Sequence, residues 1–138
     1  MGSIDLRDRS RVTIMGPGVL SGEKWTSEEI ARTPGQSMYS MILGSRGRFS
    51  IDNRIEDIAI VESPFYNIHD GPEYIRNVKL ISPWYWSTDG FQVIPRGMGR
   101  LALIERCFAF NGDDVFFPRE NLALPVFVWV WDVKTSTV

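Results

Sequence analysis

The chain has 138 residues, with 15 Lys and Arg against 17 Asp and Glu, which gives a net charge of -2 at pH 7. This length fits one domain, and the charge argues against a nucleic-acid-binding protein, which would carry a basic patch or stripe. One cysteine and one histidine exclude an intramolecular disulfide and a histidine-rich zinc site. No apolar run approaches the roughly 18 residues that a membrane span needs. We therefore expect no nucleic-acid, membrane or metal partner.

The N-terminal segment, MGSIDLRDRS, is polar and charged. It lacks the apolar stretch of roughly 7–15 residues found in a signal peptide, so we assign residues 1–10 to a leader. Thr26 and Glu29 have the spacing of a helix capping box, but Pro34 and Gly35 follow closely. A short loop or helix insertion is therefore expected near residues 26–33. The rest of the chain consists of short apolar runs separated by Gly, Pro, Asn and Asp, which is typical of short strands.

Three strand-like segments share one pattern of apolar and polar positions. Residues 55–60 (IEDIAI) match residues 75–80 (IRNVKL), and residues 104–109 (IERCFA) resemble both. A period near 20 residues with occasional longer insertions is typical of the coils of a parallel β-helix. A β-sandwich or jelly roll would also contain short strands, but it would not explain the matched segments. We therefore predict an all-β fold, a partial parallel β-helix, in which Cys107 lies in the core at the position of Ile58 and Val78.

Three aspartates are candidate catalytic residues: Asp89 within residues 86–90 (WSTDG), and the pair Asp113 and Asp114 after Gly112. Asp beside Gly is common in turns, and this is the structural alternative. The aspartates nevertheless fall in successive copies of the repeat, whose strands would stack about 4.8 Å apart. A bulge or turn at Gly112 could present both members of the pair to one cleft. We therefore expect the three carboxylates to converge.

Carboxylates at close range repel one another, and this raises the pKa of at least one of them. A carboxylic acid and a carboxylate can then coexist near neutral pH, which is the pair that glycoside hydrolysis uses. One group protonates the leaving oxygen, while the other attacks the sugar or activates water. A group of carboxylates could instead bind Ca²⁺, and the residues alone leave this alternative open.

Aromatic side chains lie close to the candidate aspartates in the sequence. Residues 84–86 (WYW) come shortly before Asp89, and residues 65–66 (FY) hold the equivalent place one copy earlier. Flat aromatic surfaces pack against the apolar faces of sugar rings. The candidate substrate-binding residues are therefore Trp84, Trp86, Tyr66 and Tyr85. The alternative is that some of them, such as Tyr85, belong to the core.

The single histidine, His69, lies in the segment NIHDG, whose composition is typical of a turn. The sequence shows no partner with which it would form a catalytic pair. We therefore expect His69 to lie in a turn and to have a structural role.

Four of these segments together resemble a known enzyme family. Residues 16–23 (GPGVLSGE), 63–67 (SPFYN), 82–90 (SPWYWSTDG) and 112–114 (GDD) are similar to glycoside hydrolase family 49, which contains dextranases and isopullulanase. The likeness is most specific in the W-[ST]-x-D-G and G-D-D blocks. It implies a right-handed parallel β-helix, an inverting mechanism and an α-glucan substrate, with no metal or organic cofactor.

The same resemblance implies a role for each aspartate. Asp113 would be the general acid that protonates the glycosidic oxygen, and Asp89 and Asp114 would position and deprotonate the attacking water. Inverting enzymes hold the acid and the base about 6.5–9.5 Å apart so that a water fits between them. The expected activity is cleavage of the α-1,6 linkages of dextran. The alternatives are cleavage of α-1,4 linkages in pullulan, and a carbohydrate-binding or inactive fragment.

Members of that family are several times longer than this chain, and they carry a signal peptide and a β-sandwich domain. We therefore expect residues 1–138 to be one partial catalytic domain, in which the leader is followed by family-like coils over residues 11–121 and a divergent tail over residues 122–138. The run LALPVFVWVW at residues 122–131 has no polar turn, so we expect no strand register there. The resemblance implies an extracellular, monomeric full-length enzyme that acts on a polysaccharide.

Overall fold

The computed structural model describes residues 4–22, 40–43, 52–83, 87–93, 103–118 and 127–133. Within these ranges every regular element is a strand, and there is no helix. The insertion expected near residues 26–33 lies outside the described residues. In the part of the chain that is described, no helix has the length and apolar character to cross a membrane.

The strands form two sheets in which every pairing is parallel. The first sheet contains, in spatial order, β1 (Ile4–Asp5), β3 (Ile42–Leu43), β5 (Ile68–Gly71), β8 (Phe91–Val93) and β10 (Phe116–Pro118). The second contains β2 (Thr13–Ser21), β4 (Arg54–Val61), β6 (Tyr74–Arg76), β9 (Leu103–Asn111) and β11 (Phe127–Val133), with β7 (Lys79–Ser82) between β4 and β9.

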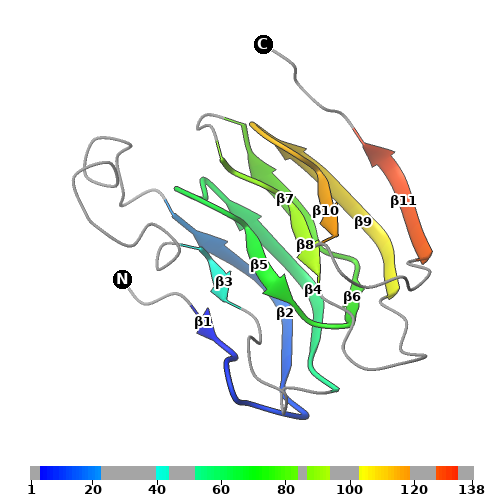
Figure 1. The fold of residues 1–138 in the computed structure, drawn as a ribbon. Coiled ribbons are helices and arrows are strands. Elements are labelled where there is room, and N and C mark those ends of the chain that lie inside the picture. The colour runs from blue at the N-terminus through cyan, green and yellow to red at the C-terminus, as the bar shows by residue number, and fades with distance from the viewer. Residues whose placement is uncertain are drawn as a thin grey trace.

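The described strands alternate between the two sheets along the chain. The first sheet receives β1, β3, β5, β8 and β10, and the second receives the strands between and after them, with β6 and β7 entering it together. Figure 1 shows the result, in which the colour passes from blue at one end of the row of strands to red at β11. Within each sheet, neighbouring strands therefore follow one another in chain order. The prediction of an all-β fold is confirmed, with parallel sheets.

The core consists of buried apolar side chains from both sheets, and they form one cluster. Strand register places equivalent residues of successive strands side by side, so apolar side chains form rows across both sheets. These rows are Ile42, Ile68 and Phe91; Ile55, Ile75 and Ile104; Ile60, Leu80 and Ala109. Cys107 is also buried, beside Val78, whose backbone N–H points to its Sγ at 3.5 Å. Its exposed fraction of 1% confirms its predicted place in the core, and this burial raises the pKa of the thiol to about 11.

In the second sheet, residues at equivalent positions along the strands have a left-handed backbone conformation. Asp57, Asn77 and Arg106 have φ angles of 58°, 50° and 55°. The Asn77 side-chain amide donates a 2.8 Å hydrogen bond to the Asp57 carboxylate, which links the segment between β6 and β7 to β4. Asn and Asp tolerate this conformation better than most residues. This conformation separates β6 from β7, while β4 and β9 continue through it.

Three local features differ from the sequence-based expectations. Residues Ile4–Asp5, assigned to a leader, pair with β3 as the first strand of their sheet. Residues Phe127–Val133, expected to lack a strand register, pair with β9, although with two register shifts. A ladder of backbone hydrogen bonds does not require a polar turn, and β-branched and aromatic residues favour strands. His69, expected in a turn, lies within β5.

The alternation of faces in β7 gives a direct test of the core. Leu80 is fully buried, whereas its neighbour Ile81 is 38% exposed. We expect Leu80→Ala to lower the free energy of unfolding by about 2–4 kcal/mol, because it removes buried methyl groups and leaves a cavity. Ile81→Ala is the matched control and should change it by no more than about 0.5 kcal/mol. Urea denaturation at pH 7 measures both, and equal losses would contradict the described facing of this strand.

Candidate active site

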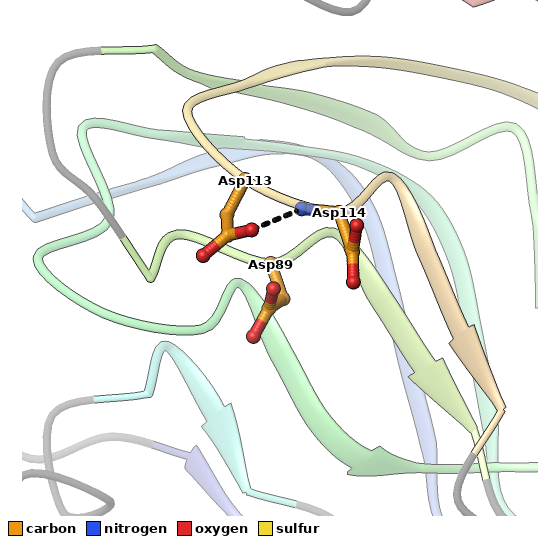
Figure 2. Close-up of side chains that lie close together, drawn as sticks. All are labelled: Asp89, Asp113 and Asp114. Atoms are coloured by element: carbon orange, nitrogen blue, oxygen red, sulfur yellow. Dashed lines mark hydrogen bonds between the residues drawn. The ribbon is translucent and has the colours of Figure 1, made fainter. Parts of the chain in front are cut away.

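The three candidate aspartates meet beside the first sheet. Asp89 lies just before β8, and Asp113 and Asp114 lie in the turn between β9 and β10. One carboxylate oxygen from each lies within 4.8 Å of the others. Figure 2 shows the three side chains close together, with Asp113 and Asp114 on one segment and Asp89 on its neighbour. The expected convergence is confirmed, and a turn brings the adjacent pair to the same place.

Backbone pairing sets the positions of these segments. The Gly90 N–H donates to the carbonyl of Asp114 at 2.8 Å, and the Phe91 N–H donates to the carbonyl of Val115 at 2.9 Å. A Cβ at Gly90 would lie 2.5 Å from the Val115 carbonyl oxygen, closer than real Cβ atoms come. Glycine therefore allows the two aspartate-bearing segments to approach each other, which explains its place directly after Asp89.

Two buried asparagines hold the backbone on which the aspartates lie. The Asn67 side-chain amide donates to the carbonyls of Thr88 and Asp89, at 3.2 and 3.1 Å. The Asn111 amide donates to the carbonyls of Asp113 and Asp114, at 2.7 and 3.1 Å. Both asparagines are at most 1% exposed, so these bonds are shielded from competition with water. The buried amides therefore act as positioning groups.

The Thr88 hydroxyl joins the two aspartate-bearing segments. It donates to the carbonyl of Ser82 at 2.8 Å and accepts from the Gly112 N–H at 2.9 Å. Sequence reasoning missed the positioning roles of Thr88 and the two asparagines. Thr88 and Asn67 occur inside the motif segments and Asn111 directly precedes one, but such polar residues are equally typical of ordinary turns.

The electrostatics single out Asp89. Its side chain is buried, and Asp113 and Asp114 are exposed. Burial raises the pKa of Asp89 to about 7, and the negative charges of Asp113 and Asp114 add to the shift, while a backbone hydrogen bond from Asp114 opposes it. The Asp113 carboxylate accepts backbone N–H bonds from Ser87 at 3.1 Å and from Asp114 at 2.9 Å. Near neutral pH the Asp89 carboxyl group therefore carries a proton part of the time, and two exposed aspartate side chains lie beside it.

This arrangement allows two kinds of chemistry. A protonated and an ionised carboxyl group can act as a general acid and a general base on one substrate. The same oxygens could contribute to a hard-cation site, although Ca²⁺ takes about 6–8 oxygen ligands and three carboxylates would supply only part of them. A bound cation would also stabilise the ionised form of Asp89 and so lower its pKa, whereas burial raises that pKa.

The aromatic candidates fall into two groups. Tyr66 is described and half-buried, and it lies just before β5 as Asp89 lies just before β8. Its ring stacks on that of Phe65, with 4.3 Å between centroids. Trp84, Tyr85 and Trp86 lie outside the described residues, so their predicted contact with substrate stays a prediction.

Comparison with known proteins identified no relative. No protein-family model, no curated protein and no solved structure matches the chain. The resemblance of the motif segments therefore stays a prediction, and the geometry of the aspartates supports the functional inference.

The raised pKa of Asp89 predicts a pH-dependent effect of Asp89→Asn on stability. A carboxyl group with a raised folded-state pKa contributes stability that is fully present below the unfolded-state value of 3.8 and is lost as pH rises through about 7. Asn resembles the protonated acid and keeps this stability at high pH. At pH 8 we expect the free energy of unfolding of the variant to exceed that of the parent by about 2 kcal/mol. This is half of what the full pKa shift of Asp89 would give, because water reaches the open side of the site and screens the charges.

The same variant should unfold with the parent's free energy at pH 3, where Asp89 is protonated in both the folded and the unfolded state. Urea denaturation across this range measures the effect. Asp8→Asn, which removes an exposed carboxylate elsewhere, is the control and should show no gain. Parallel stability curves for the Asp89 variant and the parent would show that burial and repulsion do not act on this carboxyl.

Proposed function

We propose that the protein is a glycoside hydrolase that cleaves α-glucan, with the α-1,6 linkages of dextran as its substrate. The observation that carries this proposal is the convergence of three carboxylates, one of them buried with a pKa near 7. The resemblance of the motif segments to glycoside hydrolase family 49 supports the substrate class. It also supports an extracellular, monomeric full-length enzyme.

The proposed scaffold is a right-handed parallel β-helix. Support comes from the strands that alternate between two sheets and pair only in parallel. Equivalent apolar residues also form rows across the strands, as stacked coils require. The right hand follows from the resemblance and from the general preference of parallel crossover connections, about 98% of which are right-handed.

In the proposed mechanism Asp113 donates its proton to the glycosidic oxygen as the bond from this oxygen to the anomeric carbon breaks. A water attacks the opposite face of that carbon and passes a proton to Asp89 or Asp114. Two acceptor oxygens at most 4.8 Å apart can both bind one water at about 2.8 Å, and this supports joint positioning of the water by Asp89 and Asp114. These roles follow the motif resemblance. The raised pKa of Asp89 taken alone favours Asp89 as the proton donor, and the pH dependence of kcat/KM distinguishes the two assignments.

The stereochemistry of the reaction needs its own experiment. The carboxyl groups are roughly 6.5–9.5 Å apart in inverting enzymes and roughly 5–5.5 Å apart in retaining ones, whereas the 4.8 Å limit describes one oxygen from each aspartate. Inversion is supported by the resemblance, and retention is the alternative.

We expect the purified chain to release reducing sugar from dextran, and Asp113→Asn to reduce the rate by about 10²–10⁴-fold because the general acid is lost. Reducing-sugar assays on dextran and pullulan in parallel test the activity and the linkage. Proton NMR of the first product tests the stereochemistry, with the β-anomer expected. Ile81→Ala, a substitution in the second sheet, is the control and should retain full activity.

Each contrary result has a distinct meaning. Sugar release that is lost with EDTA and restored with Ca²⁺ would favour the cation site over acid–base catalysis by carboxylates alone. Saccharide binding without release, unchanged by Asp113→Asn, would indicate a carbohydrate-binding protein. An α-anomer as first product would replace inversion by retention.

The pH dependence of kcat/KM tests the role of Asp89, because this parameter reports the ionisation of groups in the free enzyme. As a base, Asp89 is active when ionised, so kcat/KM on dextran should rise with pH through about 7, the pKa of Asp89. In Asp114→Asn one of the repelling charges is gone, and the midpoint of the rise should move to lower pH. A fall of kcat/KM through pH 7 would instead identify Asp89 as the proton donor.

A further inference from the structure

Tyr66, Asp89 and Asp114 occupy equivalent positions, each two residues before one of three neighbouring strands of the first sheet, β5, β8 and β10. The carbonyl of each accepts the N–H of a residue in the preceding segment: Met41 N–H to Tyr66 at 3.1 Å, Asn67 N–H to Asp89 at 2.8 Å, and Gly90 N–H to Asp114 at 2.8 Å. Adjacent strands lie about 4.8 Å apart, so Tyr66 is one strand spacing from Asp89 and on the side away from Asp114. The aspartate site therefore has an aromatic neighbour at the next position of the sheet.

The Tyr66 ring is in contact with two other rings. Phe65 stacks on it at 4.3 Å and 19°, and the His69 ring meets it edge to face at 4.7 Å and 88°. Tyr66 is half-buried, so part of its surface stays accessible for a ligand. An aromatic ring held by neighbours loses little conformational freedom when a sugar packs on it.

Each ring nitrogen of His69 has a polar side chain near it. Nδ1 lies 3.3 Å from the Ser40 hydroxyl, and Nε2 lies 3.9 Å from the Asp70 carboxylate. Ser40 and Asp70 are fully buried, and His69 is 5% exposed. Burial of three polar side chains costs free energy that an apolar core residue would avoid. His69 in turn contacts the Tyr66 ring, so this buried polar group lies directly beside the candidate substrate-binding residue.

The backbone of β5 is altered at the same place. Ile68 pairs with Phe91 and Gly71 pairs with Val93, so β5 has one residue more than β8 between these pairs. Asp70 takes up the extra residue with a φ of 52°, and its N–H donates to the Gln92 side chain at 3.1 Å. β-bulges of this kind redirect side chains and occur often beside active sites. In β5 the bulge lies at His69 and Asp70.

We propose that Tyr66 is the platform for the sugar ring next to the one that is cleaved, and that His69, oriented by Ser40 and Asp70, is the positioning residue for the Tyr66 ring. This inference rests on the proposed function and deepens it. The saccharide then crosses the strands of the first sheet, from Asp114 over Asp89 to Tyr66. The site therefore takes a substrate with at least two linked sugars and discriminates against simple monosaccharide glycosides.

Isothermal titration of isomaltotriose into Asp113→Asn protein measures this without turnover. Removal of the platform by Tyr66→Ala should weaken binding about tenfold, as expected for the loss of one aromatic stacking contact. His69→Ala should weaken it about threefold to fivefold, and Ser40→Ala by a smaller factor in the same direction. Ile81→Ala is the control and should leave the affinity unchanged. Circular dichroism checks the fold of each variant, and if His69→Ala does not fold, Ser40→Ala decides the question.

The decisive comparison is a double-mutant cycle. If His69 acts through Tyr66, His69→Ala should have no further effect on affinity in the Tyr66→Ala background. In the active protein, KM on dextran should rise in His69→Ala with kcat retained, because the bond-breaking groups are unchanged. Effects of His69 and Tyr66 that multiply, or an affinity that His69→Ala does not change, would overturn the positioning role.

The outcomes also separate this inference from the proposed function. Isomaltotriose binding that depends on Tyr66 and His69, without dextran hydrolysis by the parent chain, would remove the catalytic proposal and keep the platform. Dextran hydrolysis by the parent chain, with an isomaltotriose affinity that neither Tyr66→Ala nor His69→Ala changes, would keep the catalytic proposal and remove the platform. No binding and no hydrolysis would overturn both.

Discussion

The site depends on the register of parallel strands in the first sheet. Backbone hydrogen bonds between neighbouring segments place Tyr66, Asp89 and Asp114 at equivalent positions just before successive strands. Residues more than 20 positions apart in the chain therefore become neighbours at one strand spacing. A slip of one residue would turn each side chain to the opposite face and disperse the group. Gly90 is part of this constraint, because a larger residue there would push its strand away from Val115.

The same arrangement carries an energetic cost. Asp89 is buried beside two other carboxylates, and its raised pKa shows that the ionised form is disfavoured in the folded protein. Hydrogen bonds from Asn67 and Asn111 hold the backbone carbonyls of the aspartate-bearing segments in place against this repulsion. A functional site with destabilising electrostatics and a well-bonded support is common in enzymes. Here the support comes from the buried amides of Asn67, which precedes the neighbouring strand β5, and of Asn111, which ends β9.

Much of the fold could be predicted because the repeat is visible in the residues. The matched segments that contain Ile55, Ile75 and Ile104 pair in register, and Cys107 lies in the core as expected. The pairing of Phe127–Val133 with β9 could not be predicted from that repeat, because it depends on backbone hydrogen bonds that leave no residue pattern. The place of His69 in a bulged strand was missed for a related reason, since turn-forming residues also form bulges.

The amino-acid sequence by itself determined the strand-rich fold, the candidate aspartates and their expected convergence, since these follow from short-range patterns and from the spacing of repeats. Tertiary structure decided which aspartate is buried and therefore has the raised pKa. It also decided that His69 lies next to Ser40 and Asp70 and contacts the ring of Tyr66. Burial and contacts between strands depend on atoms that are distant in the chain. Composition and spacing cannot specify them until the strands are in register.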